Sequence, residues 1–403
     1  MSKSSIALFT VTNLAYLPKA LVLAESVKEH AKLSLNIYLI DQKREIPFTE
    51  NLAEIHWIED LKIDGFQRLA FKYDITELST SLKPYLAMLL LKQHEKVLFF
   101  DPDTCLYAPI DPILDDLNEN PIILTPHYTK PQDLTDESSD LGMMRFGSFN
   151  LGFFAVNRHQ EAISYLEWWH SRCMNLCYFE TQFGLSTDQK WVTIAPCFFP
   201  SLKVSFNLGY NVAFWNMHER HISQDNTGQY LINDSAPLIF FHFSSFDESN
   251  PDLLTRRPFP EQSGGREDWF GISRDYLDRM GRYKEPYAKM KYGFDHFKDG
   301  SYISPTLRRA YAAVEKEYSS DLDPFESGGQ IYQFAKRNSL LSKPGSSYIS
   351  SGYGDKNNHG RKFILVYWLM RIILRIIGPN EFNNFSRLLV YLSSYRQNRG
   401  LWK

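Results

Sequence analysis

The chain has 403 residues, of which 43% are hydrophobic, 15% aromatic and 23% charged, as in globular rather than disordered or fibrous proteins. This length suggests one large domain with additions. The net charge of −3 argues against a protein that binds nucleic acid through bulk positive charge.

The N-terminus and the cysteines favour a reducing compartment. The first residues, MSKSSIALFT, contain no long apolar run before a cleavage site, so we expect no secretory signal. Four cysteines are too few for a disulfide framework. Cys173 and Cys177 are spaced for one helix face, and we expect core residues or free thiols there. We therefore predict a cytoplasmic protein.

The first third of the chain alternates apolar strands with helices. Strands are expected at residues 5–10, 35–41, 55–58, 96–100 and 121–127, and helices at 17–30 and 81–94. Pro84 then falls in the first turn of the second helix, where proline is tolerated. The alternation predicts an α/β fold with a mostly parallel sheet and helices on both faces. Ligands bind at the carboxyl ends of such strands, where Thr10, Asp41, Asp101 and Asp103 fall.

The alternation of strands and helices continues to about residue 250, after which the composition changes. We expect a strand at 149–157, a helix at 161–173 and a helix that starts within 186–195. The apolar segment 237–246 predicts a late strand whose end falls near His242. A polar, turn-rich stretch after Pro258 indicates a boundary. We predict a main domain at 1–258, a helical accessory region at 259–342, a flexible linker at 343–360 and an amphipathic helical tail at 361–403.

The tail is apolar but interrupted by charge. Only 15 residues separate Lys362 from Gly378, and Arg371 and Arg375 among them share one helix face. A membrane-spanning helix needs about 20 apolar residues. Two interpretations are open: a helix lying at a membrane interface, or a helix docked on the protein's own core or on a second subunit.

Asp101 and Asp103 follow the apolar strand KVLFF directly. In an extended segment residues i and i+2 point the same way, so the two carboxylates can converge on one point. Mg²⁺ binds through one or two carboxylates together with substrate phosphates. Mn²⁺ accepts the same oxygen ligands and tolerates an imidazole. The alternative is a solvated Asp-Pro-Asp turn.

Residues 73–111, which contain this motif, resemble the donor-binding half of nucleotide-sugar glycosyltransferases of the GT-A type. Further segments match in order up to about residue 250: ALFTVTNLAYLPKALVLAESVKEH, FGSFNLGFFAVNR, STDQKWV, LGYNVAFWNMHER and PLIFFHFSSF. They are similar to the retaining enzymes grouped with glycogenin and lipooligosaccharide galactosyltransferases, and to bacterial envelope-polysaccharide transferases. The resemblance implies that residues 1–258 are a GT-A catalytic domain.

The resemblance also implies site residues. The metal, Mn²⁺ or Mg²⁺, would be held by Asp101, Asp103 and His242. The donor would be bound by Thr10, Thr12, Asn13, Tyr16, Lys83, Asp101 and Asn150. Asp188 and Gln189 would be catalytic, and the acceptor would meet Tyr210, Trp215 and His218.

Each role has a plainer alternative. His242 could be a core histidine, Asp188 an N-cap, and Tyr16 and the acceptor-side aromatics ordinary core residues. Two departures from the family pattern stand out. Lys83 replaces an arginine, which loses a bidentate fork. The family's lysine after the histidine is missing; it could be absent altogether or supplied by another segment, with Arg256 and Arg257 as candidate substitutes.

The resemblance implies a nucleoside diphosphate sugar donor, with a UDP-sugar expected, and a glycan or lipid-linked acceptor in bacterial surface polysaccharide synthesis. It implies transfer with retention of configuration, and no nucleic acid as a partner. Two other functions are open. A sugar nucleotidyltransferase usually has a Gly-rich loop after the first strand, and FTVTNLAYLPK has no glycine. A non-catalytic binding module on the same fold is the other.

Overall fold

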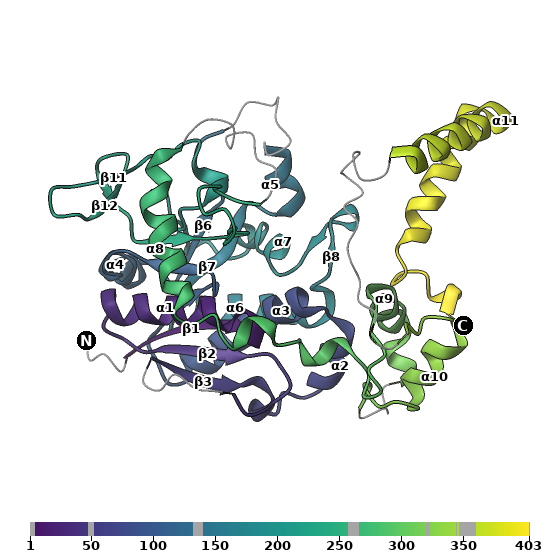
Figure 1. The fold of residues 1–403 in the computed structure, drawn as a ribbon, viewed down its shortest axis with the longest axis horizontal. Coiled ribbons are helices and arrows are strands. Elements are labelled where there is room, and N and C mark those ends of the chain that lie inside the picture. Colours follow the sequence, from purple (N-terminus) through teal and green to yellow (C-terminus); the bar gives the residue numbers. More distant parts are fainter. Residues whose placement is uncertain are drawn as a thin grey trace. The chain divides into compact units, whose positions relative to one another are not determined.

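The computed structural model describes residues 5–46, 52–131, 140–256, 266–318, 323–343, 345 and 360–402 (Figure 1). The chain forms two compact units, one of residues 1–64 and 75–293, the other of residues 65–74 and 294–403. The predicted boundary at residue 258 and nearly all of the predicted linker at 343–360 lie outside the described residues. Those domain limits therefore stay predictions.

The first unit is built on a seven-stranded sheet. In spatial order its strands are β10 (Leu202–Val204), β6 (Ile122–Pro126), β7 (Phe149–Asn157), β4 (Lys96–Phe100), β1 (Ile6–Thr12), β2 (Leu35–Leu39) and β3 (Ala53–Trp57). Only β7 runs against its neighbours β4 and β6, while the other pairings are parallel. The predicted mostly parallel α/β sheet is confirmed.

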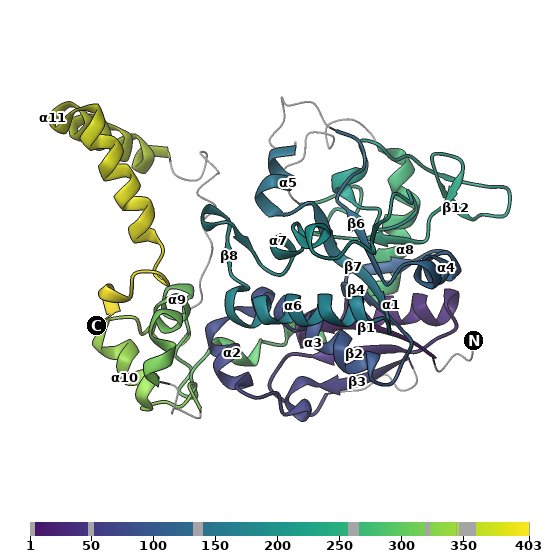
Figure 2. The same cartoon turned by 180° about the vertical axis from the view of Figure 1, so that it is seen from behind.

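Helices cover both faces of this sheet (Figures 1 and 2). On one face Leu8 and Phe100 pack with apolar residues of α1 (Leu17–His30) and α4 (Asp111–Glu119). On the other face the rings of Phe99 and Phe154 lie 5.3 Å apart, and Phe154 contacts Trp169 of α6 (Gln160–Leu176) at 5.1 Å. Alternate side chains of each strand thus enter opposite cores, as the period of two requires.

Helix α3 (Ile75–Leu91) begins earlier than predicted, so Pro84 lies inside it and not in its first turn. The residues before the predicted start, from Ile75, are helical too. Hydroxyl groups in this part bond back to helix carbonyls: Thr80 donates to the carbonyl of Thr76 at 2.9 Å and Ser81 to that of Leu78 at 2.8 Å. Pro84 removes one backbone donor from the helix interior.

The other strands and α-helices described in the first unit are short, apart from α8. They are β5 (Thr104–Leu106), α5 (Asp140–Phe146), β8 (Phe179–Glu180), β9 (Leu185–Ser186), α7 (Gln189–Val192), β11 (Ile222–Gln224), β12 (Tyr230–Ile232), β13 (Ala236–Pro237), β14 (Phe240–His242) and α8 (Phe270–Gly281). The late strand predicted at 237–246 is thus much shorter, and it pairs antiparallel with β5.

The second unit is helical. It contains α2 (Phe66–Lys72), α9 (Pro305–Val314), α10 (Gln330–Arg337) and α11 (Gly360–Ser393). Buried Arg308 of α9 donates to the carbonyls of Ala70, Phe71 and Tyr73 at 2.7–2.9 Å and so satisfies the end of α2.

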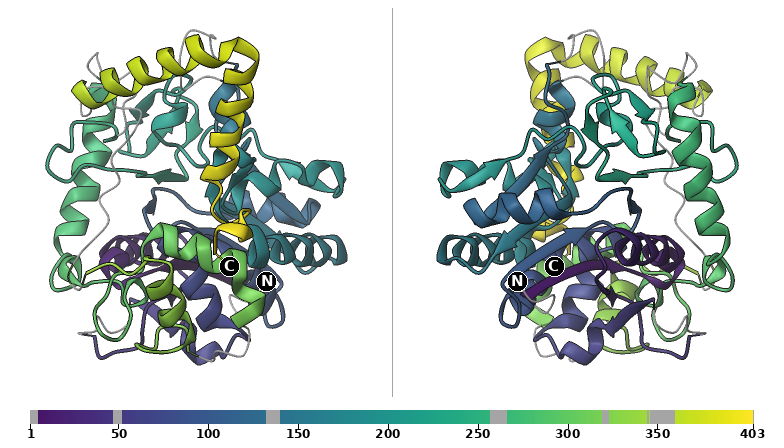
Figure 3. Two further views of the ribbon diagram at one scale, coloured as in Figure 1. Left: turned by 90° about the vertical axis from the view of Figure 1, so that its right-hand side faces the viewer. Right: turned by 90° about the vertical axis from the view of Figure 1, so that its left-hand side faces the viewer.

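Helix α11 is broken at Gly378, whose φ of 79° and ψ of 168° are not helical. Gly378 precedes Pro379, and Figures 1 and 3 show two helical arms that meet there at an angle. Among the described residues, no helix combines the length and the apolarity that crossing a membrane requires.

Candidate metal centre

The turn after β4 brings two acidic side chains to one point. The amide of Asp101 donates to the carbonyl of Gly152 on β7 at 2.8 Å, which ties the strand end to the sheet. Thr104 closes the turn by donating its amide and its hydroxyl to the carbonyl of Asp101, at 3.1 and 2.8 Å. Strand β5 then pairs with β14, and Thr104 lies opposite His242. A residue far along the chain is thereby placed beside the acidic pair.

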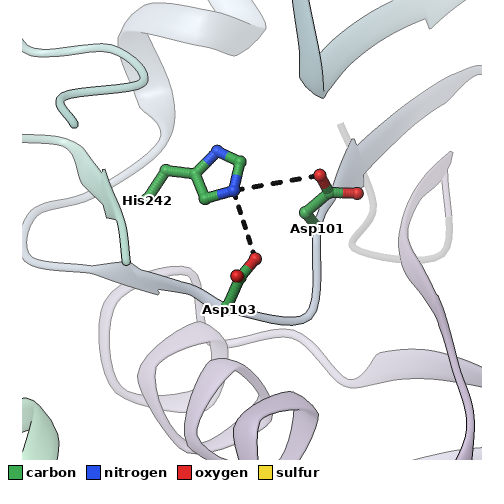
Figure 4. Close-up of side chains that lie close together, drawn as sticks. All are labelled: Asp101, Asp103 and His242. Atoms are coloured by element: carbon green, nitrogen blue, oxygen red, sulfur yellow. Dashed lines mark ion pairs between the residues drawn. The ribbon is translucent and has the colours of Figure 1, made fainter. Parts of the chain in front are cut away.

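Asp101, Asp103 and His242 converge, as the resemblance to glycosyltransferases implied (Figure 4). His242 Nε2 lies 3.1 Å from Asp103 Oδ1 and 3.9 Å from Asp101 Oδ2. One ligand atom of each residue lies within 4.8 Å of the others. Two carboxylates and one imidazole fit Mn²⁺, and they fit Mg²⁺ less well because it prefers oxygen. The alternative of a solvated turn does not fit, because Asp103 is nearly buried and points at the imidazole.

The electrostatics of Asp103 favour the charged carboxylate. Burial raises its pKa, but the charge and hydrogen bond of His242 more than offset this, so that the pKa lies well below its usual range. Lys19 of α1 also lowers this pKa. A carboxylate that stays ionised is the form that binds a cation.

Asn211 orients the imidazole, a role that sequence reasoning missed. Its Oδ1 lies 3.3 Å from His242 Nδ1. Its Nδ2 donates to Thr125 Oγ1 and Asn150 Oδ1, both at 3.0 Å. Asn211 thus satisfies a proton on His242 Nδ1, and Nε2, which bonds Asp103 in this structure, is the nitrogen that a cation held by the carboxylates would use as a ligand. The φ of 50° at Asn211 is one that asparagine tolerates better than most residues.

Gly152 leaves room for the same ring. A Cβ at this position would lie 2.4 Å from His242 Cε1 and 2.7 Å from Asn150 Oδ1. We expect Gly152→Ala to displace the imidazole, to weaken Mn²⁺ binding at least roughly ten-fold, and to cost about 1–3 kcal/mol of unfolding free energy. Titration with Mn²⁺ and chemical denaturation measure both.

The matched control is Gly142→Ala, on α5, where an added Cβ would meet nothing within 4 Å. It should leave Mn²⁺ binding unchanged. Equal Mn²⁺ affinity in Gly152→Ala and the parent protein would show that His242 is not a ligand.

Lys83 joins the metal centre to a second carboxylate. This buried lysine of α3 lies 3.2 Å from Asp101 Oδ1 and 3.4 Å from Asp188 Oδ2, and it donates to the carbonyl of Leu151 at 2.8 Å. Burial lowers its pKa, but Asp101 and Asp188 together raise it above the usual value. Lys83 is therefore a fixed cation.

Asp188 is buried, and its pKa is raised, mainly by burial and in part by the charge of Asp101, although Lys83 opposes the shift. It stands at the N-cap position of α7, but its side chain makes no cap hydrogen bond there. The N-cap alternative for this side chain is therefore wrong, because the carboxylate is turned toward Lys83.

The neighbouring predicted residues are held by the backbone of β7 and α5. Gln189 Oε1 accepts from the amide of Leu151 at 3.3 Å, and its Nε2 donates to the carbonyl of Phe146 at 3.0 Å. Asn150 Oδ1 also accepts from the amide of Gly152 at 3.0 Å. The structure thus groups Lys83, Asn150, Asp188 and Gln189 beside the metal centre.

The predicted nucleotide loop follows β1 at the same edge of the sheet. Thr10 and Thr12 end the strand and are buried. Asn13 caps the next turn by accepting from the amide of Tyr16 at 3.1 Å. Tyr16 is 46% exposed, so it is not the core aromatic of the alternative. The ammonium group of Lys19, another residue that sequence reasoning missed, lies 4.2 Å from the centre of this ring.

Asp41 follows the end of β2 and is a structural residue. Its carboxylate accepts from the amides of Leu14 at 3.4 Å, Gln42 at 3.0 Å and Gly293 at 2.8 Å. These bonds fix the loop that carries Tyr16. Burial nonetheless raises the pKa of Asp41.

The three predicted acceptor-side residues differ in their surroundings. Trp215 stands edge-on to the ring of His242 at 5.1 Å, and its buried Nε1 has no hydrogen-bond partner among the described residues. His218 lies against Tyr128 with ring centres 5.3 Å apart. Tyr210, in contrast, is 1% exposed and stacks on Phe240 in the core. Its predicted contact with an acceptor is corrected, because the ring is enclosed by apolar residues.

Of the two arginines considered as substitutes for a missing lysine, Arg256 is exposed and lies 3.5 Å from Asp247 Oδ1. Arg257 lies outside the described residues.

Comparison with known proteins gives distant likenesses. No protein-family model matches the chain. The uncharacterized protein YfnF of Bacillus subtilis (strain 168) is 26% identical over 176 residues, which cover 43% of this chain and 58% of YfnF. The uncharacterized protein YfnD of the same organism is 27% identical over 307 residues, which cover 72% of this chain and 93% of YfnD.

Several glycosyltransferases are among the similar solved structures. The galactosyltransferase LgtC, in complex with donor and acceptor sugar analogs, is 15% identical with a TM-score of 0.41 and covers 68% of this chain and 95% of its own. The bifunctional glycosyltransferase WbbM is 12% identical with a TM-score of 0.40, covering 71% and 50%. The glycosyltransferase GlyE of Streptococcus pneumoniae TIGR4 is 16% identical with a TM-score of 0.39, covering 72% and 66%. At these scores the likenesses assign no site residue and no substrate.

Proposed function

We propose that the chain is a metal-dependent glycosyltransferase that moves a hexose from a nucleoside diphosphate sugar, a UDP-sugar above all, to a hydroxyl group of a glycan or lipid-linked acceptor. The observation that carries the proposal is the meeting of Asp101, Asp103 and His242 at the carboxyl end of the sheet. The order of the matching sequence segments supports it. We place the reaction in bacterial surface polysaccharide synthesis.

The reaction breaks the bond between the anomeric carbon and the diphosphate oxygen and forms a bond from that carbon to the acceptor oxygen. Bound Mn²⁺ or Mg²⁺ would supply Lewis-acid stabilisation of the charge that grows on the leaving diphosphate. Lys83, which stays protonated between Asp101 and Asp188, adds fixed positive charge at the same place. Preorganised charges of this kind are worth several kcal/mol.

The other residues bind and orient the substrates in this proposal. Tyr16 offers an exposed ring on which a base can stack. Lys19, next to that ring, supplies the diphosphate contact that Arg256 and Arg257 were expected to make. Asn150, Asp188 and Gln189 border the transferred sugar. Trp215, whose buried indole N–H has no hydrogen-bond partner among the described residues, and His218 border the acceptor.

We further propose that the anomeric configuration is retained, with the acceptor proton passing to a phosphate oxygen of the leaving group. Asp188 then stabilises positive charge on the sugar, as a carboxylate does in enzymes that act on the same bond. Nuclear magnetic resonance of the new linkage distinguishes retention from inversion.

The test is calorimetric titration of the full chain with UDP, GDP, ADP and CDP, each with Mn²⁺ and with EDTA. We expect one of the four nucleotides to bind, and only when Mn²⁺ is present. The nucleoside diphosphate sugar with the same base, a UDP-sugar above all, should then be slowly hydrolysed. If no nucleotide diphosphate binds with Mn²⁺, the proposal is wrong. Release of pyrophosphate from a nucleoside triphosphate and a sugar phosphate would instead identify a nucleotidyltransferase.

A further inference from the structure

The first arm of α11 leaves an apolar surface uncovered. Twelve of the fourteen residues from 364 to 377 are apolar, and Arg371 and Arg375 are the other two. Ile364 is 67% exposed, Trp368 57% and Ile376 75%. A helix that is apolar nearly all round is normally buried against something. These three side chains nonetheless leave more than half of their surface exposed.

Charge is distributed unevenly between this tail and the rest of the chain. Residues 361–403 contain eight lysines or arginines and one acidic residue, Glu381, which gives a net charge of +7. The whole chain carries −3, so the preceding 360 residues carry −10. The exposed apolar surface therefore lies within a strongly basic segment.

The arm has a polar edge and an apolar face. Arg371 and Arg375 are four residues apart and share one side of the helix. Val366, Leu369, Ile373 and Ile377 follow the helical spacing on the opposite side. Tyr367 and Trp368 flank the arginines, in the position that aromatic side chains take at the boundary between water and lipid.

The dimensions exclude a span by this arm. Fourteen helical residues are about 21 Å long, whereas the hydrocarbon core of a bilayer is about 30 Å thick. The break at Gly378 turns the second arm in another direction. That arm is again exposed at Leu388, Leu389 and Val390.

The second arm is anchored at its end. Arg399 Nε donates to Glu317 Oε1 at 2.8 Å, and Asn398 Nδ2 donates to the carbonyl of Ser394 at 2.9 Å. The free end of the tail is thus held to the second unit. The apolar first arm is therefore the part of α11 that is available to bind a partner.

We propose that α11 binds the surface of an anionic lipid membrane, with its first arm in the plane of the interface and Arg371 and Arg375 at the lipid phosphates. Charge complementarity selects this occupant, because a basic apolar helix matches an anionic apolar boundary. A second copy would bring two tails of +7 together, and the one carboxylate of each tail, Glu381, lies beyond the break and not on the arm that carries the arginines. The proposal is independent of the catalytic site and does not rest on the proposed function.

The experiment is sedimentation of the full chain with vesicles of phosphatidylcholine alone, or with about one-third phosphatidylglycerol. We expect binding to the anionic vesicles, and weaker binding as salt rises to about 0.5 M. Arg371→Gln with Arg375→Gln should weaken it roughly 30-fold. Val366→Asp with Leu369→Asp should abolish it, because both charges enter the apolar face.

The control is Phe206→Asp, which places a charge on an aromatic that is 65% exposed in the first unit. It should bind vesicles like the parent, and all variants should keep the circular dichroism and nucleotide binding of the parent. Absence of vesicle binding overturns the proposal. Light scattering then distinguishes the other two occupants of the arm. If the arm joins two copies, the parent is a dimer and Val366→Asp with Leu369→Asp gives monomers. If the arm packs on its own chain, the parent is already a monomer.

Discussion

Asp103→Asn is expected to reduce sugar transfer at least roughly a thousand-fold while the fold is kept. Asp103 Oδ1 lies 3.1 Å from His242 Nε2, and the side chain is 13% exposed, so an amide of the same size fits without a cavity. The amide has no charge to offer a cation, and its NH₂ group would face the imidazole. Transfer assays and Mn²⁺ titration by electron paramagnetic resonance measure the two losses together.

Asp115→Asn is the matched control for this change. Asp115 belongs to α4 and is exposed, so the same loss of one negative charge should leave transfer and Mn²⁺ binding as they are. If Asp103→Asn and the parent transfer sugar at the same rate when both are assayed with only trace metal, the assignment of Asp103 as a ligand is wrong.

Lys83→Met is expected to lower the unfolding free energy by about 3–5 kcal/mol and to abolish transfer. The lysine stands 3.2 Å from Asp101 and 3.4 Å from Asp188. Methionine has a similar volume and leaves Asp188 as a buried carboxylate with no cation beside it. Combining Lys83→Met with Asp188→Asn should recover part of the stability but none of the transfer. Urea denaturation of the four proteins gives the coupling between the two residues.

The stability loss in Lys83→Met should also depend on pH. Burial already raises the pKa of Asp188, and Lys83 opposes this shift, so the pKa rises further when Lys83 is removed. A folded-state pKa above the unfolded value of about 3.9 means that the folded state binds more protons, and stability then falls as pH rises. The difference between parent and variant should therefore grow from pH 4 to pH 7. Lys62→Met, at an exposed position, should show no such trend.

The sheet could be predicted because each strand and helix has a recognisable pattern of apolar residues in its own segment of the sequence. VLFF and LGFFAV, within the stretches KVLFF and FNLGFFAVN, are continuous apolar runs, as expected of strands covered on both faces. The end of each parallel strand then fixed where ligand-binding residues should lie. Asp101 and Asp103 could be paired from their spacing alone. His242 could be added only through the resemblance, because no local pattern connects it to them across the chain.

The supporting residues could not be predicted, because their roles come from tertiary contacts. Asn211 looks like any loop asparagine until β14 brings His242 within 3.3 Å of it. Lys19 reads as a surface residue of α1, and only the fold of the preceding loop sets it over Tyr16. Tyr210 shows the opposite failure. Its neighbours in sequence suggest a binding surface, but Phe240 and the rest of the core enclose it.

The reversed direction of β7 decides how many chain segments can reach the metal centre. Parallel strands such as β1 and β4 only leave the sheet at this edge, but β7 enters the sheet here. Its first residues bring Asn150, the Leu151 carbonyl that accepts from Lys83, and the Gly152 carbonyl that accepts from Asp101. The incoming segment that contains α5 can therefore vary in length and composition while the strands behind it stay fixed. Related chains would then acquire new sugar preferences most readily by altering this segment.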